Sequence, residues 1–154
     1  MFQLSQRVRF TDLDIIGHAN YSVYLQLVDD TVFEWWRQDY SQETTEFGLV
    51  AVWMAATWKA AIETASAVIV SLRALDVGTT SFELYAEVTH PRGHVAFASR
   101  IRYVFTVQGR PTPLPSQMRA LLVRELVPRE VANTLRQTTR ERAPKIADDR
   151  RTTE

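Results

Sequence analysis

Hydrophobic and polar residues alternate at the start of the chain and then change to a helical pattern. Over residues 2–10 the apolar side chains share one parity, which predicts a half-buried strand: Phe2, Leu4, Val8 and Phe10. Over residues 21–38 the polar side chains recur at helical spacing in one narrow stripe: Ser22, Gln26, Asp29, Asp30, Glu34 and Gln38. Because nearly every other position there is apolar, this helix should be buried on most sides, with Ser22, Gln26 and Asp30 least buried.

Four later segments predict the strands that enclose this helix. Residues 50–62 are apolar on both parities and indicate a buried strand, whereas residues 68–75, 82–89 and 95–108 alternate with period two. The short connections carry Gly78 and Pro91, which favours hairpins. The pattern therefore predicts an α+β fold in which an antiparallel sheet of about five strands wraps around one long central helix.

The C-terminal part predicts two short helices and a charged tail. Three prolines close the sheet region, Ser116 is a candidate cap for a helix over residues 116–124, and Pro128 can start a weaker helix. Val131 and Leu135 are the only apolar points of that second helix. Charged residues dominate from residue 136, so about the last 15 residues should be disordered. We expect one domain over residues 1–126 and a weak helix with a tail over residues 127–154.

Composition and charge exclude several kinds of function. The chain has 154 residues, and its 18 basic residues balance 18 acidic ones, which gives no support for nucleic acid as a partner. The absence of cysteine excludes disulfides, thiol nucleophiles and cysteine-based metal sites. Only three histidines are present, so no metal site is expected. His90 and His94 flank a predicted turn and are interpreted as a solvated pair.

The chain begins without the features of a secretory signal. No basic segment followed by an apolar run stands at the N-terminus, and no apolar run approaches the length of a membrane span. The expectation is a cytoplasmic protein without a membrane span.

Chemically versatile residues gather between the first strand and the long helix. Asp12, Asp14, Gly17 and His18 precede Asn20, a good N-cap candidate. A helix N-terminus presents unpaired N–H groups and a positive dipole end, which can bind a developing oxyanion. A nearby carboxylate can act as a nucleophile or as a general base. Aspartate and histidine also occur in such loops as turn or capping residues, so local chemistry leaves both interpretations open.

The pattern Asp-x-Asp-x-x-Gly-His-x-Asn-x-x-x-Tyr, here Asp12 to Tyr24, resembles the hotdog-fold acyl-CoA thioesterases. Within them the chain is similar to the 4-hydroxybenzoyl-CoA thioesterases and their short-chain acyl-CoA relatives. The resemblance covers about residues 4–122 and includes the segments 78–82, 102–105 and 110–115. It implies the hotdog fold and hydrolysis of a thioester.

The resemblance also implies a role for each residue of the motif. Asp14 would carry catalysis, and the oxyanion donor would be the backbone N–H of His18, whose side chain some members also use. Asp12 would support the turn, and Gly17 would keep the backbone open near the thioester. Substrate would further contact Asn20 and Tyr24, although Tyr24 could instead serve only in packing.

The implied substrate is an acyl-CoA or acyl-carrier-protein thioester, with no metal or redox cofactor and with coenzyme A only as part of the substrate. A homodimer or homotetramer with sites at the interface is also implied. Residues 61–67 lack the Gly-Asp turn common at this place, so coenzyme A contacts stay unassigned. Four strand cations are interpreted as solvated or ion-paired: Lys59, Arg73, Arg100 and Arg102.

Two other functions remain open. A hotdog hydratase or dehydratase would need an Asp-x-Asn-Pro-x-His segment, but Asp14 and His18 stand closer together and no Asn-Pro lies between them. The second alternative is a non-catalytic domain that binds acyl thioesters. The presence of both Asp14 and His18 argues against this alternative.

Overall fold

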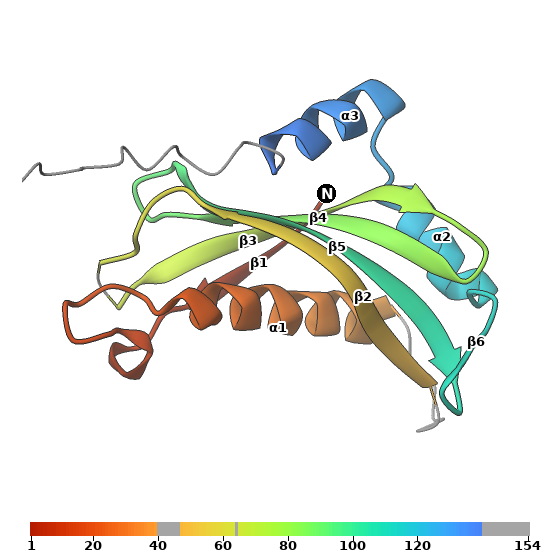
Figure 1. Ribbon diagram of the computed structural model, residues 1–154, viewed down its shortest axis with the longest axis horizontal. Coiled ribbons are helices and arrows are strands. Elements are labelled where there is room, and N and C mark those ends of the chain that lie inside the picture. The colour runs from red at the N-terminus through yellow and green to blue at the C-terminus, as the bar shows by residue number, and fades with distance from the viewer. Residues whose placement is uncertain (40–46, 64, 140–154) are drawn as a thin grey trace, which may run out of the picture.

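The long helix α1 (Tyr21–Asp39) lies across the concave face of a curved antiparallel sheet in the computed structural model (Figure 1), which describes residues 1–39, 47–63 and 65–139. The strands follow the order β1-β3-β4-β5-β2, and a short β6 pairs with β5. Their bounds are β1 (Phe2–Arg7), β2 (Phe47–Trp58), β3 (Ala67–Val77), β4 (Ser81–Thr89), β5 (Val95–Val107) and β6 (Arg110–Pro111). The predicted α+β arrangement is confirmed.

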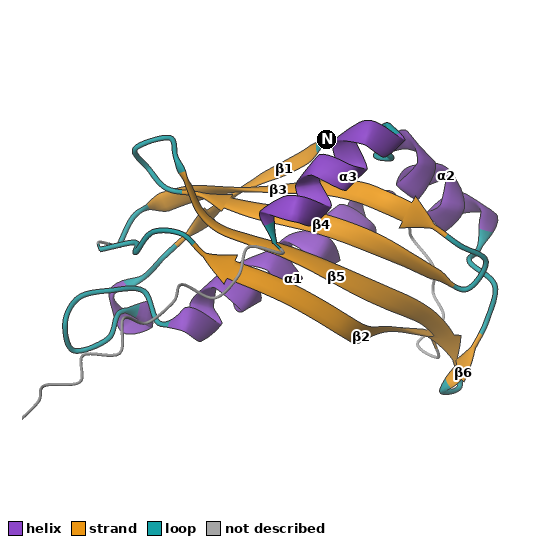
Figure 2. Cartoon of the chain, turned by 45° about the horizontal axis from the view of Figure 1, so that its top comes forward, coloured by secondary structure: helices purple, strands orange, loops and turns teal. Residues whose placement is uncertain are grey.

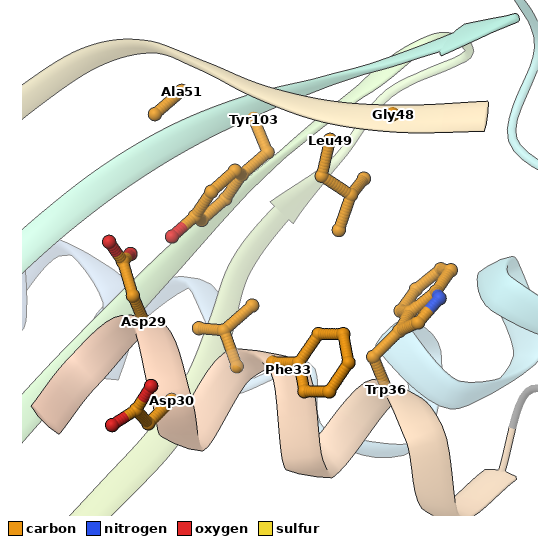
Figure 3. Close-up of a pocket in the computed structure, with 9 residues that line it drawn as sticks. Asp29, Asp30, Phe33, Trp36, Gly48, Leu49, Ala51 and Tyr103 are labelled. Carbon is orange, nitrogen blue, oxygen red and sulfur yellow. The ribbon is translucent and has the colours of Figure 1, made fainter. Parts of the chain in front are cut away.

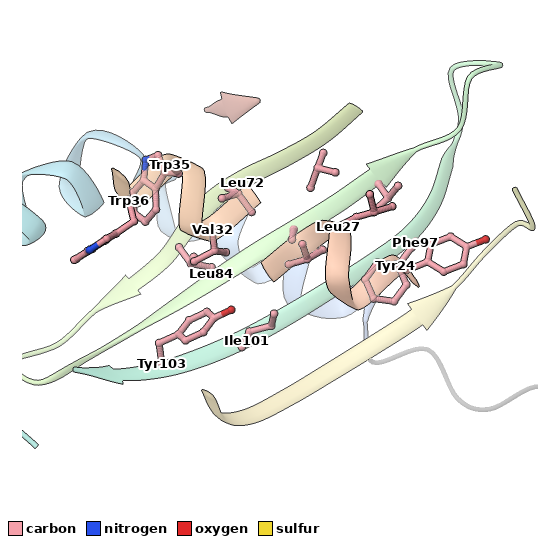
Figure 4. Packing of buried hydrophobic residues seen from close by; sticks show 14 of the residues in the cluster. Tyr24, Leu27, Val32, Trp35, Trp36, Leu72, Leu84, Phe97, Ile101 and Tyr103 are labelled. Atoms are coloured by element: carbon pink, nitrogen blue, oxygen red, sulfur yellow. The ribbon is translucent and has the colours of Figure 1, made fainter. Parts of the chain in front are cut away.

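The core lies between α1 and the inner face of β3, β4 and β5. Alternation along these strands turns every second side chain toward the helix, and the cluster in Figure 4 includes Leu27, Val32, Trp35, Leu72, Leu84 and Ile101. Gln26, Asp29 and Asp30 are exposed, which confirms most of the predicted polar stripe, whereas Ser22 is half-buried. Phe33 interrupts this stripe and is 64% exposed. A large apolar side chain on the open side of α1 is a candidate for contact with another molecule.

The prediction for residues 50–62 is wrong in two respects. The strand there ends at Trp58, and residues 50–54 are exposed because β2 lies at an edge of the sheet, next to β5. Apolar residues at both odd and even positions indicate that both faces of a strand are buried. They do not indicate whether the covering surface belongs to the same chain. The first strand is likewise shorter than predicted, since it ends at Arg7. Phe10, 84% exposed, begins a 3-10 turn instead.

Two short helices follow the sheet, α2 (Ser116–Arg124) and α3 (Arg129–Thr138). Pro115 occupies the N-cap of α2, so the predicted capping role of Ser116, its first helical residue, is wrong. Figure 2 shows α3 on the convex face of the sheet, opposite α1. Ala132 of α3 is buried and Leu135 packs against the same cluster, whereas Val131, the other apolar residue named in the prediction, is 37% exposed. Residues 140–154, the predicted disordered tail, lie outside the described residues.

A buried ionic network connects α3 to the sheet. Glu83 of β4, 3% exposed, accepts hydrogen bonds from Arg100 (3.1 Å), Arg102 (3.2 Å) and Arg136 of α3 (3.1 Å). Arg100 also donates through Nε to the Thr139 hydroxyl at 2.6 Å. Arg100 and Arg102 are therefore ion-paired, one of the two interpretations that the sequence allowed. Arg100 is buried because α3 covers it.

The histidine pair differs from the prediction. Residues 90–93 form the expected turn, and His94 is exposed, but His90 is only 9% exposed. The two rings stack at 4.4 Å, and the Nδ1 atom of His90 accepts a hydrogen bond from the Arg92 N–H at 3.0 Å. Desolvation lowers the pKa of His90, electrostatic interactions with His94 and Arg92 act in the same direction, and the charge of Glu63 opposes the shift. His90 therefore helps to shape the turn and is not a solvated side chain.

Candidate active site

The residues between β1 and α1 fold into a closed turn. Leu13 and Ala19 form an antiparallel bridge, the Asp14 N–H donates to the His18 carbonyl at 2.8 Å, and the Gly17 N–H donates to the Asp14 carbonyl at 3.0 Å. Gly17 has φ +81°, a conformation that other residues rarely adopt, while a Cβ atom there would meet its nearest neighbour only at 4.0 Å. The backbone conformation of the turn, and not close packing, therefore requires glycine.

Further hydrogen bonds hold this turn against the rest of the domain. The Ala19 N–H donates to the Ile62 carbonyl at 2.8 Å, and the Asn20 N–H donates to the Asp12 carbonyl at 3.0 Å. The Asp12 carboxylate accepts from the Arg9 N–H at 2.7 Å. Asp12 is thus engaged in local structure, which agrees with the supporting role expected for it.

The Asp14 carboxylate binds two backbone amides of its own turn. Its Oδ1 atom accepts hydrogen bonds from the Ile16 N–H at 2.9 Å and from the His18 N–H at 3.0 Å, and the residue is exposed. The His18 N–H, the expected oxyanion donor, is therefore already paired with the expected catalytic group. A substrate carbonyl can take that N–H for itself only if the Asp14 side chain moves.

The start of α1 offers a different donor. Asn20 caps the helix, with its Oδ1 accepting from the Ser22 N–H at 3.4 Å, and Tyr21 is the first helical residue. Within the described residues the Tyr21 N–H donates to no acceptor, while its neighbours His18, Ala19 and Asn20 all do. The first amide of a helix has no partner inside the helix, so the predicted N-cap at Asn20 was the signal from which this donor could have been found.

A cavity of about 390 Å³ brings several of these groups together. It is lined by Asp14, His18, Ala19, Tyr21, Tyr24, Trp58, Lys59, Ala60 and Ala61. Asp14, His18 and Tyr24 thus meet in one place, as the motif implied, whereas Gly17 and Asn20 shape the turn and the helix start without lining the cavity. Trp58 and Lys59 were not placed in the site by sequence reasoning, because only the fold brings the end of β2 to the start of α1.

Tyr24 both lines this cavity and packs in the core. Its hydroxyl accepts from the Ile62 N–H at 3.0 Å and donates to the Ala60 carbonyl at 3.4 Å, and its ring lies 5.5 Å from that of Phe97. Burial raises the pKa of the Tyr24 hydroxyl, and the hydrogen bond from Ile62 opposes this shift. Tyr24 therefore packs in the core and holds the segment after β2 against α1, whereas its contact with a substrate stays a prediction.

Two more cavities follow the seam between α1 and β2. One of about 330 Å³ is lined by Leu25, Asp29, Ala51, Val52, Trp53, Met54, Ile101 and Tyr103. The other, of about 630 Å³, is lined by Asp29, Asp30, Val32, Phe33, Trp36, Gly48, Leu49, Ala51 and Tyr103 (Figure 3). The two cavities share Asp29, Ala51 and Tyr103, so they form one groove, defined by these two linings and called the seam groove below.

Metal and membrane features were also sought in the described part of the chain. In residues 1–39, 47–63 and 65–139, no group of three or more His, Asp or Glu side chains is placed to hold a metal ion. None of the helices in these ranges is long and apolar enough to span a membrane. The cellular compartment stays a prediction.

Comparison with known proteins identifies the family. Residues 8–122 match the model of the thioesterase-like superfamily, and the chain belongs to this family. No curated protein sequence matches the chain. Its fold matches that of solved hotdog-like thioesterases, which confirms the fold that the motif implied.

Three solved structures illustrate this similarity. A thioesterase from Thermus thermophilus, solved with coenzyme A and zinc, is 27% identical, with 78% of this chain and 95% of that chain covered and a TM-score of 0.69. A 1,4-dihydroxy-2-naphthoyl-CoA thioesterase from Synechocystis is 15% identical, with 79% and 95% covered and a TM-score of 0.71. A Pseudomonas aeruginosa protein is 20% identical, with 82% and 92% covered and a TM-score of 0.76.

Proposed function

We propose that this protein hydrolyses an acyl-CoA or acyl-carrier-protein thioester to the free acid and a thiol. The observation that carries this proposal is the cavity at the start of α1, which is lined both by Asp14 and by Tyr21, the first residue of the helix. Membership of the thioesterase-like superfamily supports the same reaction. A carboxylate and a preorganised N–H donor are the two groups that thioester hydrolysis needs.

The geometry suggests how the groups divide the work. The thioester carbonyl oxygen accepts a hydrogen bond from the Tyr21 N–H, where the helix dipole stabilises the developing negative charge. In one route Asp14 attacks the carbonyl carbon, the C–S bond breaks to release the thiolate, and water then hydrolyses the mixed anhydride to the free acid. In the other route Asp14 removes a proton from a water that attacks the carbonyl carbon, and the C–S bond breaks to release the acid and the thiolate.

The Ile16 and His18 amides both donate to Oδ1 of Asp14, so Oδ2 can serve in either role, and we propose that the carboxylate turns away from these amides as the substrate binds. The freed His18 N–H then becomes a second donor to the carbonyl oxygen, which is the role expected for it from the motif.

Release of a free thiol tests the proposed reaction. We expect the protein to liberate thiol from a panel of acyl-CoA thioesters that varies in chain length and includes aromatic acyl groups, measured with a thiol-reactive dye. A hydratase or dehydratase would change the acyl chain without releasing thiol, and a binding domain would do neither. Absence of thiol release from every acyl-CoA and every acylated carrier protein would contradict the proposal.

We further propose that the protein is at least a homodimer. Large apolar side chains are exposed along β2 and beside it: Val50, Val52, Trp53, Met54, Trp58, Tyr21 and Phe33. Strand β2 also forms an edge of the sheet, where its pairing with β5 uses only one side of the strand. A second copy is the partner that fits, because two β2 edges can pair antiparallel about a two-fold axis and shield both sets of side chains.

Light scattering at micromolar concentration should therefore report a mass of at least twice 17.7 kDa. Val52→Lys, which places a charge on the exposed part of β2, should shift the protein toward monomer. Ile69→Lys is the matched control, because Ile69 is also an exposed apolar strand residue, 40% exposed, but lies on β3. A wild-type protein that stays monomeric would contradict this proposal.

A further inference from the structure

The hairpin that joins β4 to β5 is closed by contacts between two histidines. The His90 N–H donates to the His94 carbonyl at 2.8 Å, and the two rings lie nearly parallel, 4.4 Å apart and inclined by 14°. The Nδ1 atom of His90 also accepts a hydrogen bond from the Arg92 N–H at 3.0 Å. A ring nitrogen can accept only when it carries no proton, so this arrangement requires a neutral His90 ring with its proton on Nε2.

Protonation of His90 is incompatible with these contacts. An imidazolium carries a proton on both ring nitrogens, so the Nδ1–H group would point at the Arg92 N–H, donor against donor. The new charge would also lie close to His94 and Arg92, while Glu63, in the segment after β2, would attract it. His90 is only 9% exposed, and desolvation, His94 and Arg92 together lower its pKa despite the opposing effect of Glu63. Acid therefore opposes the closed hairpin.

The residues that follow the hairpin support the cavity of about 390 Å³ that Asp14 lines, called the Asp14 cavity below. The Ala96 carbonyl, two residues beyond His94, accepts hydrogen bonds from the N–H groups of Lys59 at 2.8 Å and of Ala60 at 3.1 Å. Both of these residues line the Asp14 cavity. Figure 1 shows the hairpin, the end of β2 and the start of α1 at the same end of the molecule. The first residues of β5 thus hold one wall of the cavity in place.

Aromatic contacts extend this support across the cavity. The ring of Phe97 on β5 lies 5.1 Å from that of Trp58 and 5.5 Å from that of Tyr24. Both of these neighbours line the Asp14 cavity, and Phe97 itself is fully buried beneath them. Aromatic pairs favour particular ring positions, so a shift at the start of β5 changes the cavity wall as well.

We propose, building on the proposed thioesterase function, that the hairpin is a pH-sensitive switch for the Asp14 cavity. Protonation of His90 opens the hairpin, loosens the start of β5 and slows thioester hydrolysis. Neither histidine of the hairpin lines the Asp14 cavity or the seam groove, so the effect passes through the backbone of residues 95–97. The ordinary pKa of histidine is about 6.5, and the folded-state pKa of His90 lies lower. The closed hairpin therefore keeps its full stability above about pH 6.5 and loses stability as the pH falls through the folded-state pKa.

Two substitutions at one position hold the hairpin in either state. His90→Asn keeps an acceptor for the Arg92 N–H, because an asparagine side chain commonly accepts from the backbone amide two residues on, and it does not titrate near neutral pH. His90→Leu has a similar size but no acceptor, so the hairpin should stay open at every pH. Hydrogen exchange of the Arg92, Lys59 and Ala60 amides in the intact protein, followed by NMR and corrected for intrinsic rates, reports the state. Between pH 7.5 and pH 5 their protection should fall about fivefold in the wild type, the scale of one lost hydrogen bond, and stay constant in His90→Asn.

Thiol release gives the functional readout. Between pH 7.5 and pH 5, kcat/KM of the wild type on an acyl-CoA substrate should fall about threefold more than that of His90→Asn. Protonation of Asp14 and His18 affects both proteins equally, so the difference reports the hairpin alone. His90→Leu should show at pH 7.5 the reduced activity that the wild type reaches only in acid.

Equal losses of protection and of activity in the wild type and in His90→Asn on acidification overturn the switch and leave the thioesterase proposal intact. An exchange effect at Arg92 that does not reach Lys59 and Ala60 also overturns the switch. Failure to hydrolyse any thioester overturns the thioesterase proposal, whereas the exchange measurement still tests the hairpin. If neither variant folds, the wild type decides alone, because the protection of all three amides should follow the titration of the His90 ring with one midpoint below about pH 6.5.

Discussion

Asp14→Asn should reduce thioester hydrolysis by about 10²-fold or more, because it keeps the shape of the side chain but removes the charge that attacks the carbonyl or activates water. The amide oxygen of asparagine can still accept from the Ile16 and His18 N–H groups, so the turn should stay folded. Steady-state thiol release with circular dichroism as a check on folding measures both effects. Asp14 is the site residue for which the largest catalytic loss is expected.

Asp12→Asn is the matched control, two residues away in the same motif. Its carboxylate accepts from the Arg9 N–H and does not line the cavity, so a much smaller rate loss is expected. His18→Ala should be intermediate, since the backbone N–H survives. Near-normal turnover of Asp14→Asn together with an inactive Asp12→Asn would show that the two aspartates have been assigned the wrong way round. Single-turnover hydrolysis in ¹⁸O-water separates the two roles of Asp14, because only a covalent route can leave label in its carboxylate.

Glu83→Gln should lower the free energy of unfolding by about 3 kcal/mol, which corresponds to a fall in Tm on the order of 10 °C for a chain of this size. The substitution removes the carboxylate that Arg100, Arg102 and Arg136 share, and Arg100 is 6% exposed. A buried arginine without its counter-charge is costly. Thermal and urea unfolding measure the loss. Glu130→Gln, on the exposed side of α3, is the control and should cost less than about 1 kcal/mol.

The same network gives a pH dependence whose sign follows from Glu83. Desolvation alone would raise the pKa of its carboxyl, but Arg136, Arg100 and Arg102 together bring the pKa below its ordinary value. A lowered folded-state pKa means that the contribution to stability is complete above the unfolded pKa of about 4.3 and is lost as the pH falls through the lower folded value. The difference in stability between wild type and Glu83→Gln should therefore be constant above about pH 5 and shrink below about pH 4. A difference that grows on acidification would contradict this assignment.

Sequence patterns predicted those parts of the fold that face the core of the domain. The buried face of the helix over residues 21–38 repeats every 3.6 residues, and the buried faces of strands β3, β4 and β5 repeat every two residues. The structure places all four elements as expected. The pattern failed at β2, since apolar residues on both sides indicate burial but cannot tell a core strand from an edge strand. It also failed at Arg100, because no local pattern shows that α3 will cover it.

Sequence reasoning predicted which residues line the candidate site better than it predicted how they are arranged. The motif brought Asp14, His18 and Tyr24 into one cavity, but the hydrogen bond between the Asp14 carboxylate and the His18 N–H depends on a turn conformation that residue spacing does not determine. The contributions of Trp58 and Lys59 depend on where β2 ends. Asp29 and Tyr103, which both line the seam groove, are 74 positions apart, and only the packing of α1 on the sheet brings them together.

The position of α3 limits how copies of this protein can assemble. With α3 lying over the convex face, two sheets cannot stack back to back unless the helix first detaches and gives up the contact between Arg136 and Glu83. A tetramer of that kind would expose a buried charge network in each subunit. We therefore expect any assembly larger than the proposed β2 dimer to use surfaces away from the convex face that α3 covers, such as the second sheet edge formed by β1. The C-terminal helix thus limits the ways in which the proposed dimer could assemble further.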